Sequence, residues 1–262
     1  MVIHSEKNQR IQQLVRLREK ARERKKLQVF TIEGVREISL AIQGGYTLRE
    51  VYHCPAITSA GKSRLLDMVQ GAAVFEVSKK VYEKLAMRES TEGIIAVAAA
   101  KLTPLKQLSF AAEPLLLVVE EIEKPGNLGA LLRTADATGA DAVIACGDAD
   151  WYNPQTIRAS LGTVFTNRIV SADTLEIKKW LHEKHITTYA ASPSGDCLYT
   201  RADYTKPCAI VLGSEARGLS AAWLDNVHHK IVIPMKGIID SLNVSAAAAV
   251  LLYEALRQRS AA

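Results

Sequence analysis

Two short apolar runs near the C-terminus, Ala209–Gly213 and Lys230–Met235, constrain most strongly how this chain can fold. Runs of this length, each followed by a loop of small and polar residues, are typical of buried strands. The second loop leads into a helix that begins near SLNVS, residues 241–245. In open α/β sheets ligands bind at the carboxyl ends of strands, so we expect the functional site in these two loops.

The alternation of apolar runs and helical segments extends back along the chain. Leu115–Glu120 is apolar throughout, as expected of a strand covered on both faces. Apolar residues at helical spacing predict a helix over 127–138, with Asn127 as its N-cap, before a strand at Ala142–Cys146. This half of the chain therefore predicts an α/β domain with a parallel sheet. The remaining elements are predicted as helices over 153–163 and 174–184 and a strand over 187–192.

The first hundred residues show a shorter version of the same pattern. A helix over 5–26 has apolar residues on one side and bases on the other. Alternating elements predict a small α/β domain, and residues 101–114, which contain Pro104 and Pro114, form the best linker. We therefore expect domains at 1–106 and 107–262. The further elements are predicted as strands over 30–34, 48–53, 73–77 and 93–99 and helices over 35–43, 63–70 and 79–87.

Composition excludes several other classes of protein. Hydrophobic residues make up 48% and charged residues 23%, which is ordinary for a globular protein. The sequence contains neither an apolar run of about 18 residues nor a secretory signal, so we expect no membrane span and a cytoplasmic location. The four cysteines form no CxxC pair, and only His228 and His229 are adjacent histidines, so we expect reduced thiols and no metal site.

The net charge of +5 is unevenly distributed, because bases crowd the first helix. Two interpretations stay open on charge alone: a solvated helix face, or a surface that attracts phosphates.

The two C-terminal loops have the composition of a cofactor-binding cradle. Gly213, Gly218 and Gly237 allow close approach of backbone to a ligand, and short polar side chains lie near a helix N-terminus. Helix capping alone also explains Ser241 and Asn243. A nicotinamide-dependent oxidoreductase is disfavoured, because the loop after Glu120 lacks the pattern G-x-G-x-x-G.

Three segments in this order resemble the SpoU/TrmH family of SPOUT RNA methyltransferases. They are EKPGNLGALLR (123–133), VLGSEARGLS (211–220) and IPMKGIIDSLNVSAAAAVLLYE (233–254), and IRASLGTVF (157–165) is also similar to the family. FTIEGVREISLAIQGG (30–45) and TEGIIAV (91–97) resemble the substrate-binding domain of many members, which is similar to an RNA-binding ribosomal protein.

The resemblance implies a parallel sheet with a deep trefoil knot in roughly 190–257, a fold that general connection rules would not predict. It also implies S-adenosylmethionine as cofactor, a homodimer formed through the C-terminal domain, and an active site at the subunit interface. The implied reaction is methylation of a ribose 2′-hydroxyl in structured RNA, most naturally ribosomal RNA. A transfer RNA methyltransferase and a non-catalytic RNA-binding or ribosome-assembly factor are the alternatives.

The resemblance also implies roles for individual residues. Arg133 would orient the target ribose and phosphate and stabilise negative charge, whereas proton abstraction by a guanidinium is an open question, since that group stays protonated. The implied catalytic residues are Arg133, Glu215, Ser241 and Asn243. The implied cofactor-binding residues are Ser192, Gly213, Ile233, Met235 and Leu242, and the implied substrate-binding residues are Asn127, Arg133 and Arg158.

Overall fold

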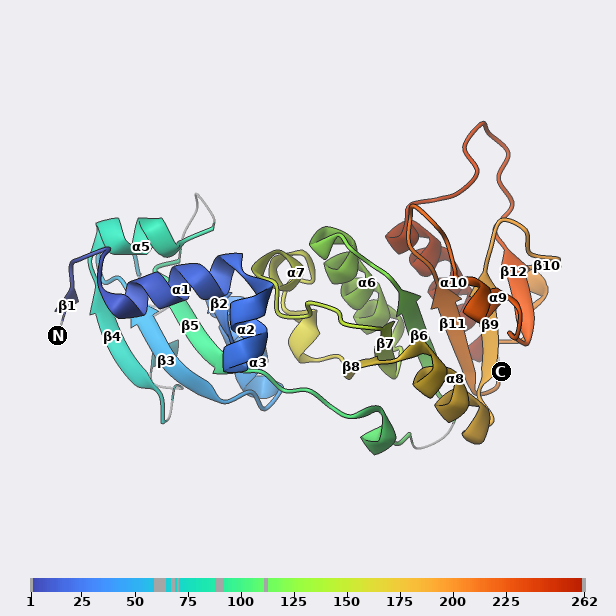
Figure 1. The fold of residues 1–262 in the computed structure, drawn as a ribbon, viewed down its shortest axis with the longest axis horizontal. Coiled ribbons are helices and arrows are strands. Elements are labelled where there is room, and N and C mark those ends of the chain that lie inside the picture. The colour runs from blue at the N-terminus through green and yellow to red at the C-terminus, as the bar shows by residue number, and fades with distance from the viewer. Residues whose placement is uncertain are drawn as a thin grey trace. The chain divides into compact units, whose positions relative to one another are not determined.

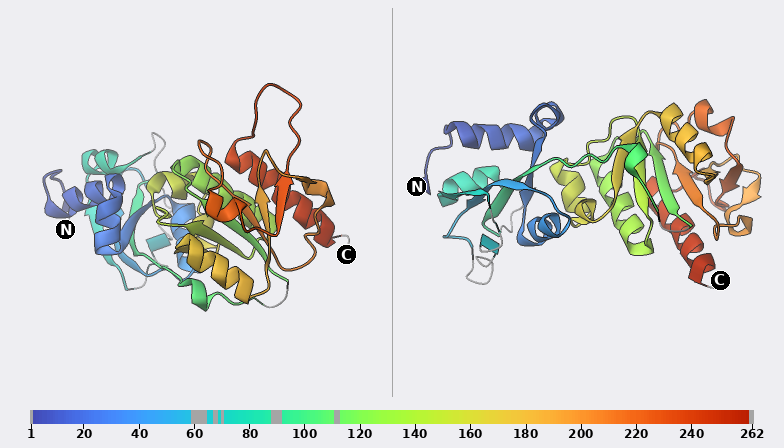
Figure 2. Two further views of the ribbon diagram at one scale, coloured as in Figure 1. Left: turned by 45° about the vertical axis from the view of Figure 1, so that its right-hand side comes forward. Right: turned by 90° about the horizontal axis from the view of Figure 1, so that it is seen from below.

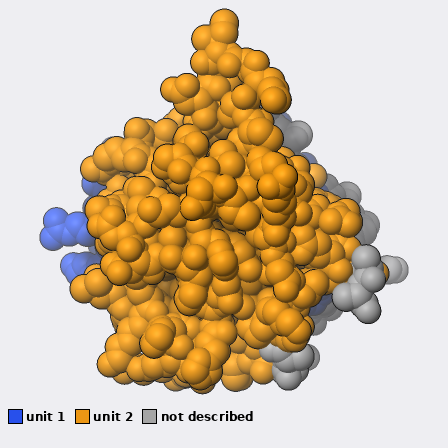
Figure 3. Space-filling view, turned by 90° about the vertical axis from the view of Figure 1, so that its right-hand side faces the viewer, with its two compact units in different colours: residues 1–101, 152–166 blue, residues 102–151, 167–262 orange. Residues whose placement is uncertain are grey.

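The computed structural model describes residues 2–58, 65–66, 69, 71–87, 92–110 and 113–260 (Figure 1). The chain forms two compact units, which Figure 3 shows in different colours. Each unit contains its own sheet. Unit 1 contains residues 1–101 and 152–166, and unit 2 contains residues 102–151 and 167–262. Segment 152–166, which the sequence analysis placed in the second domain, therefore packs with the first unit.

Unit 1 contains a mixed five-stranded sheet in the order β1-β4-β3-β5-β2. Strands β1, β4 and β3 are parallel, and β3–β5 and β5–β2 are antiparallel pairs. Helices α1 and α5 cover one face and α3 the other (Figure 2). The strands are β1 Val2–Ile3, β2 Val29–Glu33, β3 Leu48–His53, β4 Ala73–Val77 and β5 Ile94–Ala99; the helices are α1 Gln9–Glu19, α2 Ala21–Leu27, α3 Val35–Gln43, α5 Lys79–Leu85, α7 Pro154–Ala159 and the 3-10 turn η2 Thr163–Phe165.

The predicted helix over 5–26 is wrong as one element, because the chain bends at Lys20. That residue has an extended backbone (φ −117°, ψ 111°) between α1 and α2. The Arg24 side chain is buried and donates to the main-chain carbonyls of Leu17 (2.5 Å) and Arg18 (3.1 Å) in the last turn of α1. Arg24 thus satisfies carbonyls that a continuous helix would have paired with later amides.

Aromatic packing explains why segment 152–166 belongs to unit 1. The ring of Tyr152 stacks on Phe30 of β2, with centroids 4.1 Å apart and planes 9° apart. Phe165 meets the edge of Tyr46 at 5.1 Å, and the Tyr152 hydroxyl donates to the Lys101 carbonyl (2.7 Å). Because these rings are buried, separating the segment from the unit would expose a large apolar area.

Unit 2 contains a seven-stranded sheet in the order β10-β12-β9-β11-β6-β7-β8, in which every pairing is parallel. The parallel α/β prediction is confirmed; the knot stays a prediction. The strands are β6 Leu115–Glu120, β7 Ala142–Cys146, β8 Ile169–Ala172, β9 Thr187–Ala191, β10 Cys197–Leu198, β11 Cys208–Leu212 and β12 His229–Val232; the helices are α6 Pro125–Thr138, α8 Thr174–Glu183, α9 Ala221–Leu224 and α10 Val244–Ser260, with 3-10 turns η1 Leu105–Gln107 and η3 Tyr199–Arg201.

Helices cover both faces of this sheet, as its apolar strands require. Leu116 and Val118 of β6 join a core cluster with Ile177 and Trp180 of α8 and Trp223 of α9. Helices α6 and α10 pack against each other and lie on the opposite face (Figure 2). Strands β6 and β11 are buried along their whole length, which explains their uninterrupted apolar sequence.

The sequence predictions and the structure differ in further details. Asn127 was predicted as the N-cap of α6, but that helix begins at Pro125 and Lys124 is its N-cap residue. Strands β1, β8 and β10 were not predicted. The predicted helix over 63–70 falls on a segment most of which lies outside the described residues. Within the described chain, no helix is both long enough and apolar enough to cross a membrane.

Candidate active site

A cavity of about 310 Å³ lies where β9, β11 and β12 end. Pockets for small molecules begin at about this size. The loops that follow the three strands line it, together with the start of α10, so residues far apart in the sequence meet at one sheet edge. All five residues predicted to bind the cofactor line this cavity, namely Ser192, Gly213, Ile233, Met235 and Leu242, and so do Glu215 and Ser241.

The loop after β11 is closed on itself by two glycines. The main chains of Ser214 and Gly218 hydrogen-bond to each other in both directions, at 3.1 Å and 2.9 Å. A Cβ atom on Gly213 would lie 2.1 Å from the carbonyl carbon of Gly218, which is far inside van der Waals contact. Gly213 is therefore required for a tight loop that places backbone against the cavity.

The loop between β12 and α10 is long and projects away from the sheet (Figures 1 and 3). Its two ends line the cavity through Met235 on one side and Asp240 and Leu242 on the other. Its tip carries Ile238, which is fully exposed, and Ile239, which is 63% exposed. Sequence analysis missed Asp240, whose position in the cavity follows from the path of this loop.

A polar network joins the loop after β11 to the starts of α6 and α10. The Glu215 carboxylate accepts from Lys124 Nζ (3.0 Å) and from the side-chain amide of Asn243. The same amide donates to Asn127 Oδ1 (3.3 Å). Asn243 also caps α10, because its Oδ1 accepts from the backbone amide of Ser245 (3.0 Å). The capping interpretation of Asn243 is thus confirmed, while its amide remains available to hold Glu215.

Lys124 is the functional candidate that sequence analysis missed in this network. Its hydrogen bond lowers the pKa of the Glu215 carboxyl, partial burial opposes this effect, and Asn127 adds a smaller lowering. Glu215 is therefore ionised at neutral pH, as an acceptor for both Lys124 and Asn243 must be. The sequence signal was a Lys and a Glu in loops after β6 and β11, which became informative only once those strands proved to be neighbours.

Arg133 and Ser241 have the fewest contacts among the predicted catalytic residues. Arg133 is exposed on α6, and within the described part of the chain no group hydrogen-bonds to its guanidinium. Ser241 is exposed at the cavity wall, and α10 is capped by Asn243 rather than by this hydroxyl. Arg133 does not line the cavity in this structure, which brings together Glu215 and Ser241 but not the arginine. An exposed guanidinium without a protein partner is suited to binding an anion such as phosphate.

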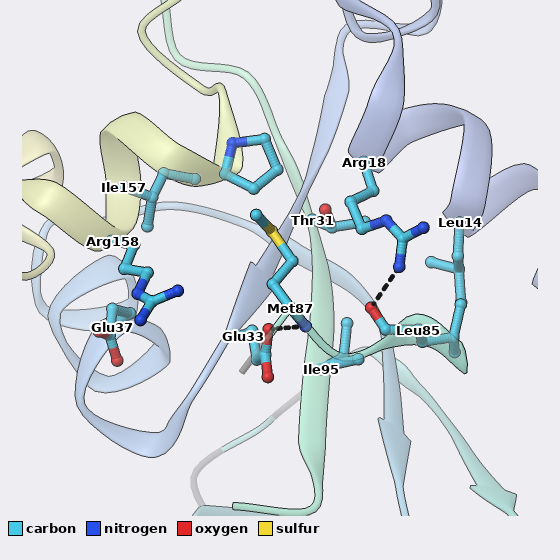
Figure 4. Close-up of a pocket in the computed structure, with 11 residues that line it drawn as sticks. Leu14, Arg18, Thr31, Glu33, Glu37, Leu85, Met87, Ile95, Ile157 and Arg158 are labelled. Atoms are coloured by element: carbon cyan, nitrogen blue, oxygen red, sulfur yellow. Dashed lines mark hydrogen bonds between the residues drawn. The ribbon is translucent and has the colours of Figure 1, made fainter. Parts of the chain in front are cut away.

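Arg158 lies in unit 1, on α7, at the edge of a different and much smaller cavity. Figure 4 shows its lining: Arg18 and Leu14 come from α1, and Ile157 and Arg158 from α7. The volume is about 30 Å³, which is too small for a nucleotide. The substrate-binding role of Arg158 therefore stays a prediction that this cavity does not support.

The described residues contain no group of three or more His, Cys, Asp or Glu side chains that could hold a metal ion. The polar side chains that line the cavity carry hydroxyls, the carboxylates of Glu215 and Asp240, and the guanidinium of Arg217.

Comparison with known families identifies the C-terminal half. Residues 114–253, more than half of the chain, match the SpoU rRNA Methylase family. The chain belongs to this family. Residues 8–96 match a second model, the MRM3-like substrate binding domain. The expected family and the expected pairing of a SpoU domain with an N-terminal substrate-binding domain are thus confirmed.

Individual SpoU proteins are similar over both domains. The 23S rRNA (uridine(2479)-2′-O)-methyltransferase of Streptomyces viridochromogenes is 31% identical over 97% of this chain and 91% of its own. The crystal structure of an RNA 2′-O ribose methyltransferase is 41% identical, covers 99% of this chain and 100% of its own, and has a TM-score of 0.86. The SpoU methyltransferase AviRb from Streptomyces viridochromogenes, solved in complex with AdoMet, has a TM-score of 0.91 at 29% identity, over 97% of this chain and 99% of its own.

Proposed function

We propose that this chain transfers the methyl group of S-adenosylmethionine to a ribose 2′-hydroxyl in ribosomal RNA. The observation that carries the proposal is the cavity at the ends of β9, β11 and β12, which lies inside the SpoU match and gathers all five predicted cofactor residues. A relative that spans the same two domains is named for this reaction on 23S ribosomal RNA.

The cavity suits S-adenosylmethionine in size and chemistry. Leu212, Ile233 and Leu242 offer apolar surface for an adenine, and the tight Gly213 loop offers main-chain groups for its edge. Asp240 places negative charge at the wall, which suits a sulfonium or an α-amino group, whereas the Glu215 carboxylate is already paired with Lys124. When bound, the cofactor supplies a methyl group that is activated by the positive sulfur.

The protein must hold the ribose oxygen in line with that methyl group and stabilise the charge that develops on it. We assign this to Arg133, whose exposed guanidinium can orient a phosphate and stabilise negative charge. Glu215, Asn243 and Asn127 keep the loops in position through their network. Ser241, at the cavity wall, completes the proposed catalytic set.

The proposal assigns different roles to the two domains and includes a homodimer. Residues 1–106 would bind RNA and residues 107–262 would carry out methyl transfer, with the knot in roughly 190–257. We propose a homodimer formed through the second domain, since Ile238 of the projecting loop and Tyr253 of α10 expose apolar surface that a second copy could cover. The proposed location is the cytoplasm, where ribosomal RNA is available.

The deciding experiment maps ribose methylation in ribosomal RNA from cells with and without the gene, using reverse-transcription stops at low nucleotide concentration. We expect one stop to disappear in the deletion strain, to return with the wild-type chain, and not to return with Arg133→Ala. In vitro, Arg133→Ala should lower kcat by roughly 10²- to 10³-fold, as for other lost charge-stabilising donors, with cofactor binding retained.

Two other outcomes would change the proposal. Unchanged ribosomal RNA with a lost methyl group in transfer RNA would move the target to transfer RNA and keep the reaction. Full complementation of the deletion phenotype by Arg133→Ala, with no methylation change in either RNA, would instead indicate the non-catalytic assembly factor.

A further inference from the structure

The positive charge of this protein is concentrated in one short segment. Residues 16–26 contain seven bases and only two acids, an excess of five. The net charge of the whole chain is also +5, so the remaining residues are neutral in sum. A charge excess confined to eleven consecutive residues is a localised electrostatic feature rather than a general basic character.

The fold turns this segment into a bent pair of helices, which we call the basic elbow (residues 16–26). Helix α1 buries Ile11, Leu14 and Leu17 against the sheet, and this leaves its other side to solvent. The chain bends at Lys20, and α2 leaves at a steep angle to α1 (Figures 1 and 2). Buried Arg24 holds the bend by its hydrogen bonds to the end of α1.

Four cations of the basic elbow are both exposed and unpaired. Arg16, Lys20, Arg22 and Lys26 are exposed, and none of them forms an ion pair with any residue of the described chain. Neighbouring cations behave differently: Arg10 pairs with Glu50 at 2.5 Å, and Arg18 with Glu19 at 2.8 Å. The basic elbow thus presents positive charge that this unit does not neutralise itself.

We propose that the basic elbow grips the phosphate backbone of the RNA substrate, with Arg16, Lys20, Arg22 and Lys26 in contact with phosphates. This inference rests on the proposed function and adds where the RNA is held. Contacts to phosphate fix the position of a protein on RNA and carry no sequence information, so the elbow would supply affinity and orientation, not choice of nucleotide. Each phosphate contact releases counterions, which makes the binding salt-dependent.

The test uses the full-length chain and a variant in which Arg16, Lys20, Arg22 and Lys26 are all replaced by Gln. The matched control replaces four other exposed lysines, Lys79, Lys80, Lys179 and Lys184, by Gln, which changes the net charge by the same amount. Binding to a fluorescein-labelled RNA hairpin is measured by anisotropy over a range of salt concentrations. Methyl transfer to an unmodified 23S ribosomal RNA transcript gives KM and kcat.

For the elbow variant we expect the slope of log Kd against log salt to fall by about three, since each lost contact removes roughly 0.7 to 0.9. Affinity at about 0.1 M salt should fall at least about tenfold, and KM for RNA should rise, with kcat and cofactor affinity unchanged.

An equal loss of RNA affinity in the elbow variant and in the control variant would mean that only overall charge matters, and it would overturn the proposal. Wild-type slopes in the elbow variant would also overturn it and would leave an acidic protein as the partner to test. Absence of methyl transfer by the wild-type chain would count against the proposed function alone, because hairpin binding still tests the elbow.

Discussion

At the scale of single residues, the proposed active site depends on a few close contacts between loops. Glu215 receives hydrogen bonds from Lys124, just before α6, and from Asn243, just before α10. Gly213 allows that loop to close against Gly218. Substitutions at these contacts should change the pH dependence of activity in one case and the affinity for the cofactor in the other.

Replacing Lys124 by Met should move the acidic limb of the activity profile to higher pH. Lys124 lowers the pKa of Glu215, so its removal raises that pKa, and the carboxylate is then lost at a higher pH as the solution is acidified. The measurement is kcat/KM between pH 4.5 and 8. Lys124→Arg should restore most of the wild-type profile, whereas a Met variant with an unmoved acidic limb would exclude Lys124 from positioning Glu215.

Replacing Gly213 by Ala should weaken S-adenosylmethionine binding by about tenfold or more, because a steric clash of this kind displaces the loop. The added Cβ would lie 2.1 Å from backbone, which cannot move aside as a flexible side chain could. Gly126→Ala is the matched control, because its Cβ would meet no atom within 4 Å. Calorimetric titration of both variants with S-adenosylmethionine tests this prediction. Equal affinities of the two variants would show that the loop accommodates the added methyl group without losing cofactor binding.

At the scale of elements, the end of α10 is tied to the loop before β11. Arg259 donates to the main-chain carbonyls of Tyr204 (2.8 Å), Lys206 (2.9 Å) and Glu113 (2.6 Å). Gln258 adds hydrogen bonds in both directions with Tyr204 and Ala202. One side chain thus satisfies carbonyls from two separate segments, and it anchors the helix that carries Asn243 at its other end.

Arg259→Ala should lower the free energy of unfolding by about 2–4 kcal/mol, because several hydrogen bonds to a charged donor are lost together. Arg257→Ala is the control, since the Arg257 side chain is 65% exposed and its one ion-pair partner among the described residues is Glu254 on its own helix. An exposed pair of this kind contributes less than about 1 kcal/mol. Urea denaturation of the two variants compares them, and equal losses would contradict the anchoring role.

At the scale of the whole molecule, buried tyrosines make the free energy of unfolding fall as the pH becomes alkaline. Burial raises the pKa of Tyr46, Tyr52, Tyr82, Tyr152 and Tyr204, and it raises the pKa of Tyr189 to about 12. An unfolded tyrosine titrates near pH 10. Because the folded pKa values are higher, the folded state keeps these protons longer, and ionisation of the unfolded chain removes stability as pH rises.

The urea midpoint should therefore stay nearly constant from pH 7 to 9 and fall steadily above about pH 10. Tyr204→Phe should reduce that fall without loss at pH 7, since among the described residues no group hydrogen-bonds to the buried Tyr204 hydroxyl. Tyr199→Phe, at a position outside the buried core, should leave the curve nearly unchanged. A midpoint that is flat to pH 11 would show that the buried tyrosines do not control alkaline stability.

The sequence by itself determined most of the strands and the two loops that line the cavity. Strands β6 and β11 are read directly from their apolar runs, because burial on both faces leaves a continuous signal. Strands β1, β8 and β10 are too short or too polar for that signal, and the bend at Lys20 depends on a side chain four residues later. Asn243 was recognised as a short polar residue near a helix N-terminus, whereas the catalytic roles predicted for Glu215 and Asn243 came from the resemblance to the SpoU/TrmH family.

Only the tertiary structure decided which of these residues meet. Strand order is a property of the whole sheet, and it makes neighbours of β6 and β11 although they are almost ninety residues apart in the chain. Lys124 and Glu215 become partners for that reason alone. Likewise, Arg158 belongs to unit 1 because Tyr152 and Phe165 pack among its aromatic rings, a contact between distant residues that local periodicity does not encode.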